Sequence, residues 1–380
     1  MPKKIDLQHL RTVEALEVEG PRNITKVARK LRIPAETLRK RVRRMASQFS
    51  WRFNVNIYHA NLGLKKAVVF AQAVPGYEDV LFNSLKTNDF WLYVNRCYGM
   101  NEGCIAVYTI PANHSNDFES FIEQLEDSGV ARTAQVFWST CFHYVHLKPN
   151  WFNDTSKSWN FQWDRWTEEA TKHRGQLQLP DTLRDPDEFP IKGDRTDILI
   201  LKELEKNPLI RMTELAKRIG ISQQLAAYHY LRHIQDQNLI ESFEVSFPYF
   251  EKNASDLFVF TFEFNNHDSF ARFASSLLDK PFARGLGKVL GKNALIAHLY
   301  LPRAEFRKFV DILSKLIQAG SLADYSYVIQ DPEKDSRQTI SYEYFKNKKW
   351  TYDHKKHVKT LENLVKSQGP KKKEAKKRLD

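Results

Sequence analysis

The chain has 380 residues, of which 42% are apolar and 13% aromatic, so it can build several hydrophobic cores and we expect two to four domains. It contains no run of about 18 apolar residues and no apolar signal region near its start, so we expect no membrane span. The net charge of +12 lies at the two ends: residues 1–55 hold 14 Lys+Arg against 5 Asp+Glu, and residues 346–380 hold 13 against 4. This distribution favours a nucleic-acid partner, and three cysteines without metal-ligand spacing are typical of a cytoplasmic protein.

The chain begins with three predicted helices, over 6–18, 24–31 and 34–45. In each of them apolar residues recur at helical spacing, and Gly20-Pro21 separates the first from the second. Helix, short helix, tight turn and helix is the order of a helix-turn-helix, whose last helix enters the DNA major groove. A strand over 51–55 follows in the position of a wing. We therefore predict a winged helix-turn-helix domain over 1–58.

The third of these helices is strongly basic outside its apolar stripe of Leu38, Val42 and Met45. Like charges on one helix repel by a few tenths of a kcal/mol per neighbouring pair, which a helix tolerates readily against a polyanion. The alternative is a solvated basic surface without a partner. We predict that the first module contacts DNA through Thr37, Arg39, Lys40, Arg41, Arg43 and Arg44.

A βαββαβ pattern comes next, with strands and helices predicted in turn over 67–74, 76–87, 90–98, 104–110, 118–129 and 131–145. This order is typical of a ferredoxin-like domain, which we place over 62–162. Residues 163–193 are polar and contain three prolines after position 179. They are therefore predicted to be a flexible linker, long enough for the two halves of the chain to associate without constraint.

The pattern then repeats. Residues 212–221 match 24–33 at an offset of 188, and residues 302–320 match 111–129 at an offset of 191. A constant offset across separate elements predicts a tandem duplication. We place a second winged helix over 194–250, a second ferredoxin-like domain over 255–355 and a partly disordered basic tail over 356–380. The predicted fold class is α+β, with two winged helix-turn-helix domains each followed by a ferredoxin-like domain.

The second winged helix differs in charge from the first. Residues 192–245 hold 8 Lys+Arg and 8 Asp+Glu, a net charge of zero. Because phosphate neutralisation sets most non-specific affinity, we expect the first module to supply affinity and the second to read bases or shape. The alternative for the second module is a protein contact. Its predicted DNA contacts are Gln223, Gln224, Tyr228, His229 and Arg232.

The element order resembles that of the Lrp/AsnC (leucine-responsive, feast/famine) transcription regulators, as does the run Thr213-Glu214-Leu215-Ala216 with Ser222 before the next helix. The resemblance covers about 5–146 and 194–345. It implies pairing of the sheet domains, here as a pseudo-dimer within one chain, with a homodimer of chains left open. The fused tandem and the basic tail depart from that family and favour an archaeal source.

The same resemblance implies a small-molecule effector near the turn between the central strands. In this chain the turns carry Gly99, Asn101 and Glu102 in the first half and Gly291 and Asn293 in the second. The Asp that the family usually has there is missing from both turns, which argues against an amino-acid effector.

Two other functions remain as alternatives. Some tetrapyrrole (siroheme-type) decarboxylases resemble the same layout, sometimes as fused pairs, but the basic helix argues against one here. An architectural or RNA-binding protein is the other. His143 and His146 face opposite sides of a predicted strand, and the Gly285-Leu286-Gly287 run lacks the context of a phosphate loop. We predict a cytoplasmic regulator that binds double-stranded DNA at two unequal half-sites, with no enzymatic activity, cofactor, metal or membrane partner.

Overall fold

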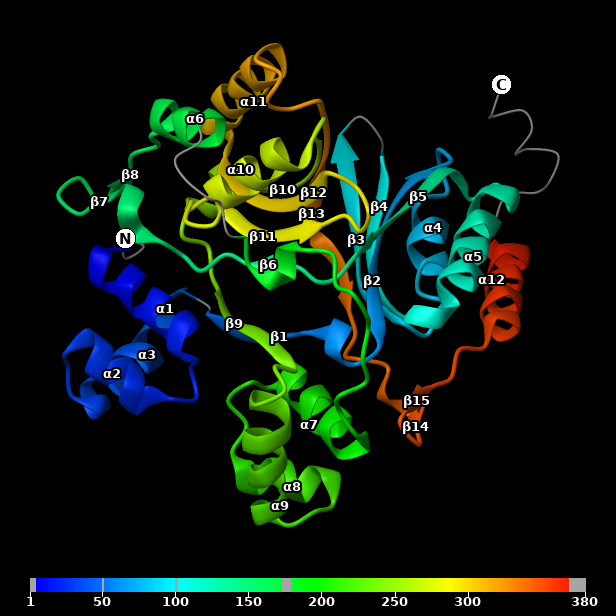
Figure 1. The fold of residues 1–380 in the computed structure, drawn as a ribbon, viewed down its shortest axis with the longest axis horizontal. Helices are drawn as coiled ribbons and strands as arrows, with labels where there is room; N and C mark the ends of the chain where they lie inside the picture. Colours follow the sequence, from blue (N-terminus) through cyan, green and yellow to red (C-terminus); the bar gives the residue numbers. More distant parts are fainter. Residues whose placement is uncertain (1–4, 50, 100–101, 173–178, 369–380) are drawn as a thin grey trace.

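The computed structural model describes residues 5–49, 51–99, 102–172 and 179–368. It confirms the predicted fold class: two winged helix-turn-helix units lie in the lower part of the molecule, and two ferredoxin-like units lie above them (Figure 1). Within the described residues, each helix is either too short or too polar to cross a membrane.

The first half begins with a helix that is fixed at its start by its own side chains. Asp6 accepts a hydrogen bond from the His9 backbone N–H at 2.8 Å, and the His9 ring accepts one from the Asp6 N–H, which together form a capping box. Arg32 ends the second helix in the left-handed region at a φ of 54°. The elements of this half are α1 (Leu7–Glu19), α2 (Ile24–Leu31), α3 (Ala35–Phe49), β1 (Arg52–Ile57), β2 (Leu64–Ala73), α4 (Glu78–Ser84), β3 (Trp91–Gly99), β4 (Gly103–Pro111), α5 (Ser115–Asp127), β5 (Ala131–Ser139), β6 (His143–Tyr144), β7 (Phe152–Asn153), β8 (Ser158–Trp159) and α6 (Trp163–Thr171).

The second half repeats this order. A capping box at Asp194 starts its first helix, as the one at Asp6 does in the first half. Its elements are α7 (Arg195–Lys206), α8 (Met212–Ile219), α9 (Gln223–Tyr228), the π-helical turn η5 (His229–Gln235), β9 (Ile240–Ser246), β10 (Ser255–Glu263), α10 (His267–Leu277), β11 (Ala283–Lys288), β12 (Ala294–Pro302), α11 (Arg303–Gln318), β13 (Asp324–Arg337), β14 (Phe345–Lys346), β15 (Lys349–Trp350) and α12 (His354–Gln368).

The two four-stranded sheets join into one. Their strand order is β5-β2-β4-β3-β13-β10-β12-β11-β6, so β3 of the first half pairs with β13 of the second, and β6 pairs with β11. The end of β5 also contacts the residues that follow β11. Ser139 forms a bridge with Val289, and Leu290 N donates to the Trp138 carbonyl at 2.8 Å. The sheet therefore closes on itself, and each half completes the edges of the other.

The alternation of side chains along the strands separates an inner core from two outer ones. In β2, Ala67 and Val69 pack in the same cluster as Phe118 of α5, whereas Val68 belongs to a separate inner cluster with Val259 of β10. Helices α4 and α5 cover the outside of the first sheet, and α10 and α11 cover the outside of the second (Figure 1).

The two halves also exchange their C-terminal helices. The ring of Trp166 in α6 is fully buried and stacks on Phe309 of the second half at 5.4 Å. In return, α12 lies against α4 and α5 of the first half, where His357 is 1% exposed. The expected free linker over 163–193 is therefore wrong at its start, because a packed helix occupies it. The expected disorder of the tail is likewise wrong up to residue 368, which ends α12.

The predicted wing strand forms, but it is not free to reach DNA as a wing. β1 pairs antiparallel with β9 of the second module, from Arg52 opposite Ser246 to Ile57 opposite Ile240. Its backbone hydrogen-bonding groups are thus used in a two-stranded ribbon that connects the two winged helices.

The exchange of α6 yields a stability prediction. Replacing Trp166 by Ala should lower the free energy of unfolding by about 3–5 kcal/mol, because it leaves a cavity among Phe273, Phe282 and Phe309. Arg165→Ala, at an exposed position of the same helix, is the control and should change stability by less than about 0.5 kcal/mol. Urea unfolding of the full chain measures both; equal effects would mean that α6 is not docked.

Candidate nucleic-acid interface

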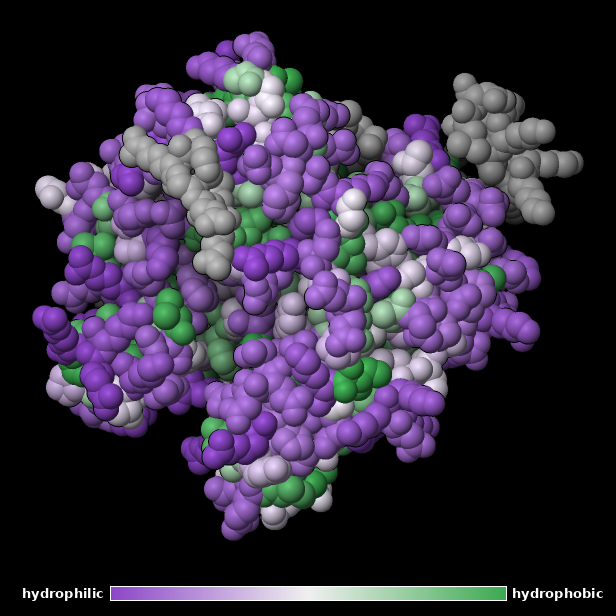
Figure 2. Space-filling view, in the orientation of Figure 1, coloured by the Kyte–Doolittle hydropathy of each residue, from purple (hydrophilic) through white to green (hydrophobic). Residues whose placement is uncertain are grey.

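The first module presents the basic face of α3 to solvent because the opposite face is fixed in the core. Leu38 and Met45 are fully buried, in one cluster with Leu10 and Val13 of α1. The side chains away from this stripe are exposed: Glu36, Thr37, Arg39, Lys40, Arg43 and Arg44. Figure 2 shows this module as a mainly hydrophilic surface.

Most of these cations are not neutralised by neighbouring carboxylates. Arg39 lies 3.4 Å from Glu36, and both side chains are about half exposed, so this pair is weak. Within the described part of the chain, Lys40, Arg43 and Arg44 form no ion pair with an acidic side chain. Their charge is therefore free to act on a partner.

Arg41 has a different place from the one expected. Its guanidinium donates to Thr12 Oγ1 at 3.3 Å and to Gln8 Oε1 at 3.4 Å, both on α1. Because it is half-buried against α1, Arg41 is less available to a DNA phosphate than the exposed cations of α3, and its role as a DNA contact stays a prediction.

The second module presents a less polar face. Gln223, Gln224, Tyr228 and Arg232 are exposed as expected, but Leu225 and Leu231 are exposed among them. Apolar atoms are visible over α8 and α9 at the lower end of the molecule (Figure 2). The Arg232 guanidinium lies 3.5 Å from Asp236, so it is partly neutralised.

His229 is not on this face. It is 7% exposed, and its Nδ1 lies 2.8 Å from Asp197 Oδ1 of α7. The turn η5 directs the ring into the module, so the expectation that His229 contacts DNA is wrong.

The two modules touch. Arg22, in the turn between α1 and α2, donates to the carbonyls of Pro208 and Ile210 at 2.9 and 2.8 Å, and its guanidinium lies 5.1 Å from the centre of the Tyr230 ring. These contacts and the β1–β9 ribbon fix the two recognition helices relative to one another.

A buried carboxylate anchors the first module to the second half. Glu17 of α1 is 3% exposed and accepts hydrogen bonds from Tyr144 OH at 2.6 Å, Leu147 N at 2.8 Å and Val245 N at 3.1 Å. Burial raises the pKa of Glu17 to about 7, although these hydrogen bonds and the nearby Arg284 guanidinium favour its ionised form. Nothing in the sequence around Glu17 distinguishes it, because its partners lie 127 to 228 positions away.

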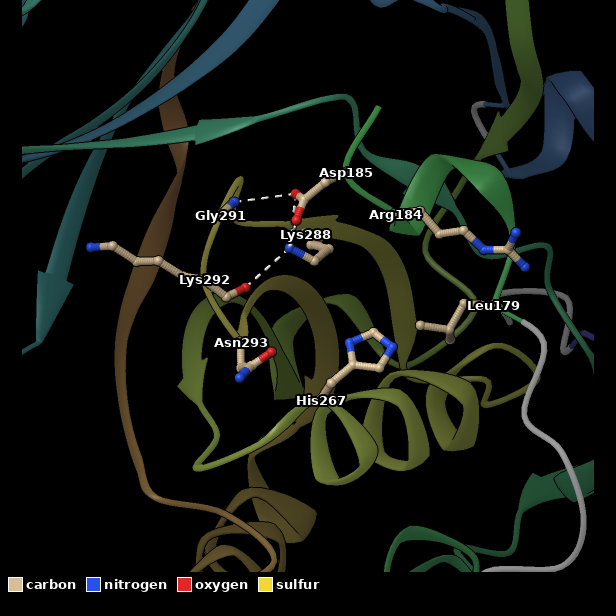
Figure 3. A pocket seen from close by; sticks show the side chains of 8 residues that line it. All are labelled: Leu179, Arg184, Asp185, His267, Lys288, Gly291, Lys292 and Asn293. Atoms are coloured by element: carbon tan, nitrogen blue, oxygen red, sulfur yellow. Dashed lines mark hydrogen bonds and ion pairs between the residues drawn. The ribbon is translucent and has the colours of Figure 1, made fainter. Parts of the chain in front are cut away.

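A pocket of about 500 Å³ lies where residues 179–185 cross the second sheet unit (Figure 3). The Lys288 ammonium is buried there and contacts both carboxylate oxygens of Asp185 at 2.9 Å. Arg184 and Lys292 lie at opposite sides, with the His267 ring between them (Figure 3). Sequence analysis missed these residues, because no motif links 184–185 to the strands.

The expected effector residues fall in two places. Gly291 and Asn293 line this pocket, whereas Gly99 lies opposite Val328 in the β3–β13 pairing. Glu102 directly precedes β4, and its carbonyl accepts from Ala73 N at the end of β2. Asn101 lies outside the described residues.

Comparison with known proteins supports the winged helix. Residues 193–232 match the family described as "Winged helix-turn-helix DNA-binding". No curated protein matches the sequence.

Solved structures share the architecture at low identity. The siroheme decarboxylase NirDL matches with a TM-score of 0.48 and 9% identity over 94% of this chain and 99% of that chain. Shorter matches are an AsnC family transcriptional regulator from Agrobacterium tumefaciens (TM-score 0.30, 19% identity, 39% of this chain and 94% of that one) and E. coli AsnC (0.28, 15%, 39% and 97%). These likenesses concern the fold alone.

One prediction is corrected by this comparison. We expected the chain not to be an enzyme, because its third helix is basic and because the sequence shows no clear decarboxylase motif over 90–98 or 281–290. The comparison contradicts that expectation, because the structure of NirDL, which matches over 94% of this chain, is that of a decarboxylase. At 9% identity this likeness concerns the fold and assigns no activity to this chain.

The pKa of Glu17 generates a pH prediction. The folded-state pKa of about 7 lies above the ordinary value of 4.5, so between these values the folded chain binds more protons than the unfolded chain. The stability of the wild type relative to Glu17→Gln should therefore decrease, by up to about 3 kcal/mol, as pH rises from 4.5 to 7. Glu14→Gln, on the same helix, controls for the loss of a carboxylate. Parallel pH profiles of the wild type and Glu17→Gln in urea unfolding would contradict this role.

Proposed function

We propose that the chain is a transcription regulator that binds double-stranded DNA, with the first winged helix supplying most of the affinity. The observation that carries this proposal is the row of exposed cations on α3, of which Lys40, Arg43 and Arg44 have no acidic partner in the described chain. Unpaired like charges on one helix face are unfavourable by themselves and become favourable against phosphates.

The second winged helix has a complementary role in this proposal. The family match covers it, yet its net charge is zero, so its contribution to phosphate binding is small. Gln223 and Gln224 are exposed at the start of α9, from where a side-chain amide can pair with an adenine edge. Tyr228 and Arg232 are exposed one and two turns further along.

Two unequal recognition helices on one scaffold imply an asymmetric target. The strand pairings β1–β9, β3–β13 and β6–β11 take the place of a dimer interface, so each chain forms a pseudo-dimer. We expect two different half-sites, spaced by one helical turn of DNA or a multiple of it.

A second candidate function is a tetrapyrrole decarboxylase. The observation in its favour is the pocket of about 500 Å³, which is lined by His267 and, at its two sides, by Arg184 and Lys292, whose charged ends point outward (Figure 3). The Arg184 guanidinium also lies 3.3 Å from Asp181. Cations suit a ligand with several carboxylates, and an imidazole suits a bound metal. The same pocket would serve an anionic effector in the first proposal.

The DNA proposal predicts the effect of a double substitution. Arg43→Ala with Arg44→Ala should weaken binding to all duplex sequences and reduce the salt slope by about 0.9 for each phosphate that is no longer neutralised. The measurement is fluorescence anisotropy at several salt concentrations. Lys348→Ala with Lys349→Ala removes the same charge from the β14–β15 hairpin, on the other side of the molecule (Figure 1), and should leave the slope unchanged. The proposal would be overturned if the α3 double variant and the hairpin double variant had the same salt slope of duplex binding, or if the wild type did not bind duplex DNA at low salt.

The decarboxylase candidate predicts a spectroscopic change. Titration of the chain with iron-uroporphyrin III should shift the absorbance of the porphyrin, and Arg184→Ala with Lys292→Ala should weaken the binding that causes it. The same hairpin double variant is the control. If the spectrum does not change, this candidate fails while the DNA proposal is unaffected.

A further inference from the structure

Two imidazoles and two carboxylates meet inside the second winged helix. Asp194 is the N-cap of α7 and Asp197 lies in its first turn, while His229 and His233 belong to η5, which continues the recognition helix. One ligand-type atom of each of these four side chains lies within 4.8 Å of the others. No motif in the sequence predicts this cluster, because 32 positions separate His229 from Asp197.

The separations suit a tetrahedral ion. His229 Nδ1 lies 2.8 Å from Asp197 Oδ1 and 3.8 Å from Asp194 Oδ1, and His233 Nδ1 lies 3.2 Å from Asp197 Oδ2 and 3.8 Å from Asp194 Oδ2. A tetrahedral Zn²⁺ with bonds of about 2.0–2.1 Å holds its ligand atoms about 3.3–3.4 Å apart. The nitrogen–oxygen separations of 2.8 Å (His229 Nδ1 to Asp197 Oδ1) and 3.8 Å (His233 Nδ1 to Asp194 Oδ2) lie on both sides of that value. All four ligand atoms lie within 4.8 Å of one another, so side-chain adjustments would place them around one ion.

Each of the two carboxylates has one oxygen atom that accepts no backbone hydrogen bond. Asp194 Oδ1 accepts from the N–H groups of Thr196 and Asp197, and Asp197 Oδ2 accepts from the Asp194 N–H. None of these three backbone contacts uses Asp194 Oδ2 or Asp197 Oδ1, and Asp197 Oδ1 faces His229 Nδ1 at 2.8 Å. These two oxygens and the two Nδ1 atoms form an N₂O₂ set, which suits Zn²⁺ and its first-row neighbours.

The charge of the cluster also favours a cation. Asp197 is fully buried, and among the described residues no Lys or Arg forms an ion pair with it or with Asp194. A buried carboxylate is costly unless it is paired or coordinates a metal. His233 and Asp194 are 27% and 34% exposed, so an ion could enter from that side.

The first module fills the equivalent place differently. At the offset of 188 that relates the two winged helices, His229 corresponds to Arg41 and His233 to Met45. Arg41 brings a permanent cation to α1, where its guanidinium donates to Thr12 and Gln8. The second module has a histidine in place of this cation. Asp194 has an equivalent in Asp6, which caps α1 in the same way, so the difference lies in Asp197, His229 and His233, which replace His9, Arg41 and Met45.

We propose that Asp194, Asp197, His229 and His233 bind one divalent transition-metal ion, Zn²⁺ first among them. The ion ties the recognition helix of the second module to the start of α7. Tyr228 and Arg232, which face solvent next to the two histidines, are thereby held in place.

The test uses the full chain after treatment with EDTA and dialysis. Titration with Zn²⁺ in a calorimeter should show one saturable site per chain and raise the melting temperature. Co²⁺ in its place should give the intense visible absorption of tetrahedral coordination. The readouts concern the metal and not DNA, so they are independent of the proposed function.

Two variants and one control locate the site. Asp194→Asn keeps the helix cap, because Asn caps a helix as well as Asp does, but removes a charged ligand. This variant and His233→Gln should each reduce Zn²⁺ affinity by more than the roughly 10- to 100-fold that outer-shell changes cause. His114→Gln is the matched control, because His114 is 26% exposed and its Nδ1 lies 2.7 Å from Asp117 in a similar pair.

The proposal is overturned if the wild type shows no saturable binding, if both variants bind Zn²⁺ as the wild type does, or if His114→Gln loses binding to the same extent. In the first case the cluster is a set of hydrogen bonds from two imidazoles to Asp197. In the other two the ion binds elsewhere on the chain.

Discussion

Backbone hydrogen bonds between the two halves are the constraint on which the rest of the structure depends. An unpaired edge strand exposes N–H and C=O groups and is prone to pair with other chains. Here β3 pairs with β13, β6 with β11 and β1 with β9, so each half supplies the partner for the edges of the other. Neither sheet is complete alone, which explains why the helices α6 and α12 lie on the opposite half from the one they follow in sequence.

This scaffold lets the two winged helices diverge. Because the halves are joined through backbone groups, the side chains on the recognition helices are not needed to hold them together. The first module has gained exposed cations on α3, and the second has exposed Gln223, Tyr228 and Leu231. A homodimer of identical chains could not separate affinity from readout in this way.

The attachment of each recognition helix shows the same divergence. In the first module Arg41 connects α3 to α1 by hydrogen bonds, and the buried Glu17 connects α1 to β6 through Tyr144 and to β9 of the second half through Val245. In the second module His229 connects η5 to Asp197 of α7. Similar helix arrangements are thus held by different chemistry: an arginine that donates to neutral oxygen atoms in the first module, and an imidazole that faces a buried carboxylate in the second.

The sequence by itself determined the repeat, the order of the elements and the basic helix, because these depend on local periodicity and on charge that can be counted along the chain. The helix over 35–49 and the sheet order within each half are examples. Only the tertiary structure decided that the wing strands pair with each other, that α6 and α12 cross over, and that His229 points inward. Contacts such as that of Tyr144 with Glu17 join residues 127 positions apart, and such contacts leave no periodic signal in the sequence. They depend on which apolar faces and which unpaired backbone and side-chain polar groups remain exposed after the local helices and strands have formed.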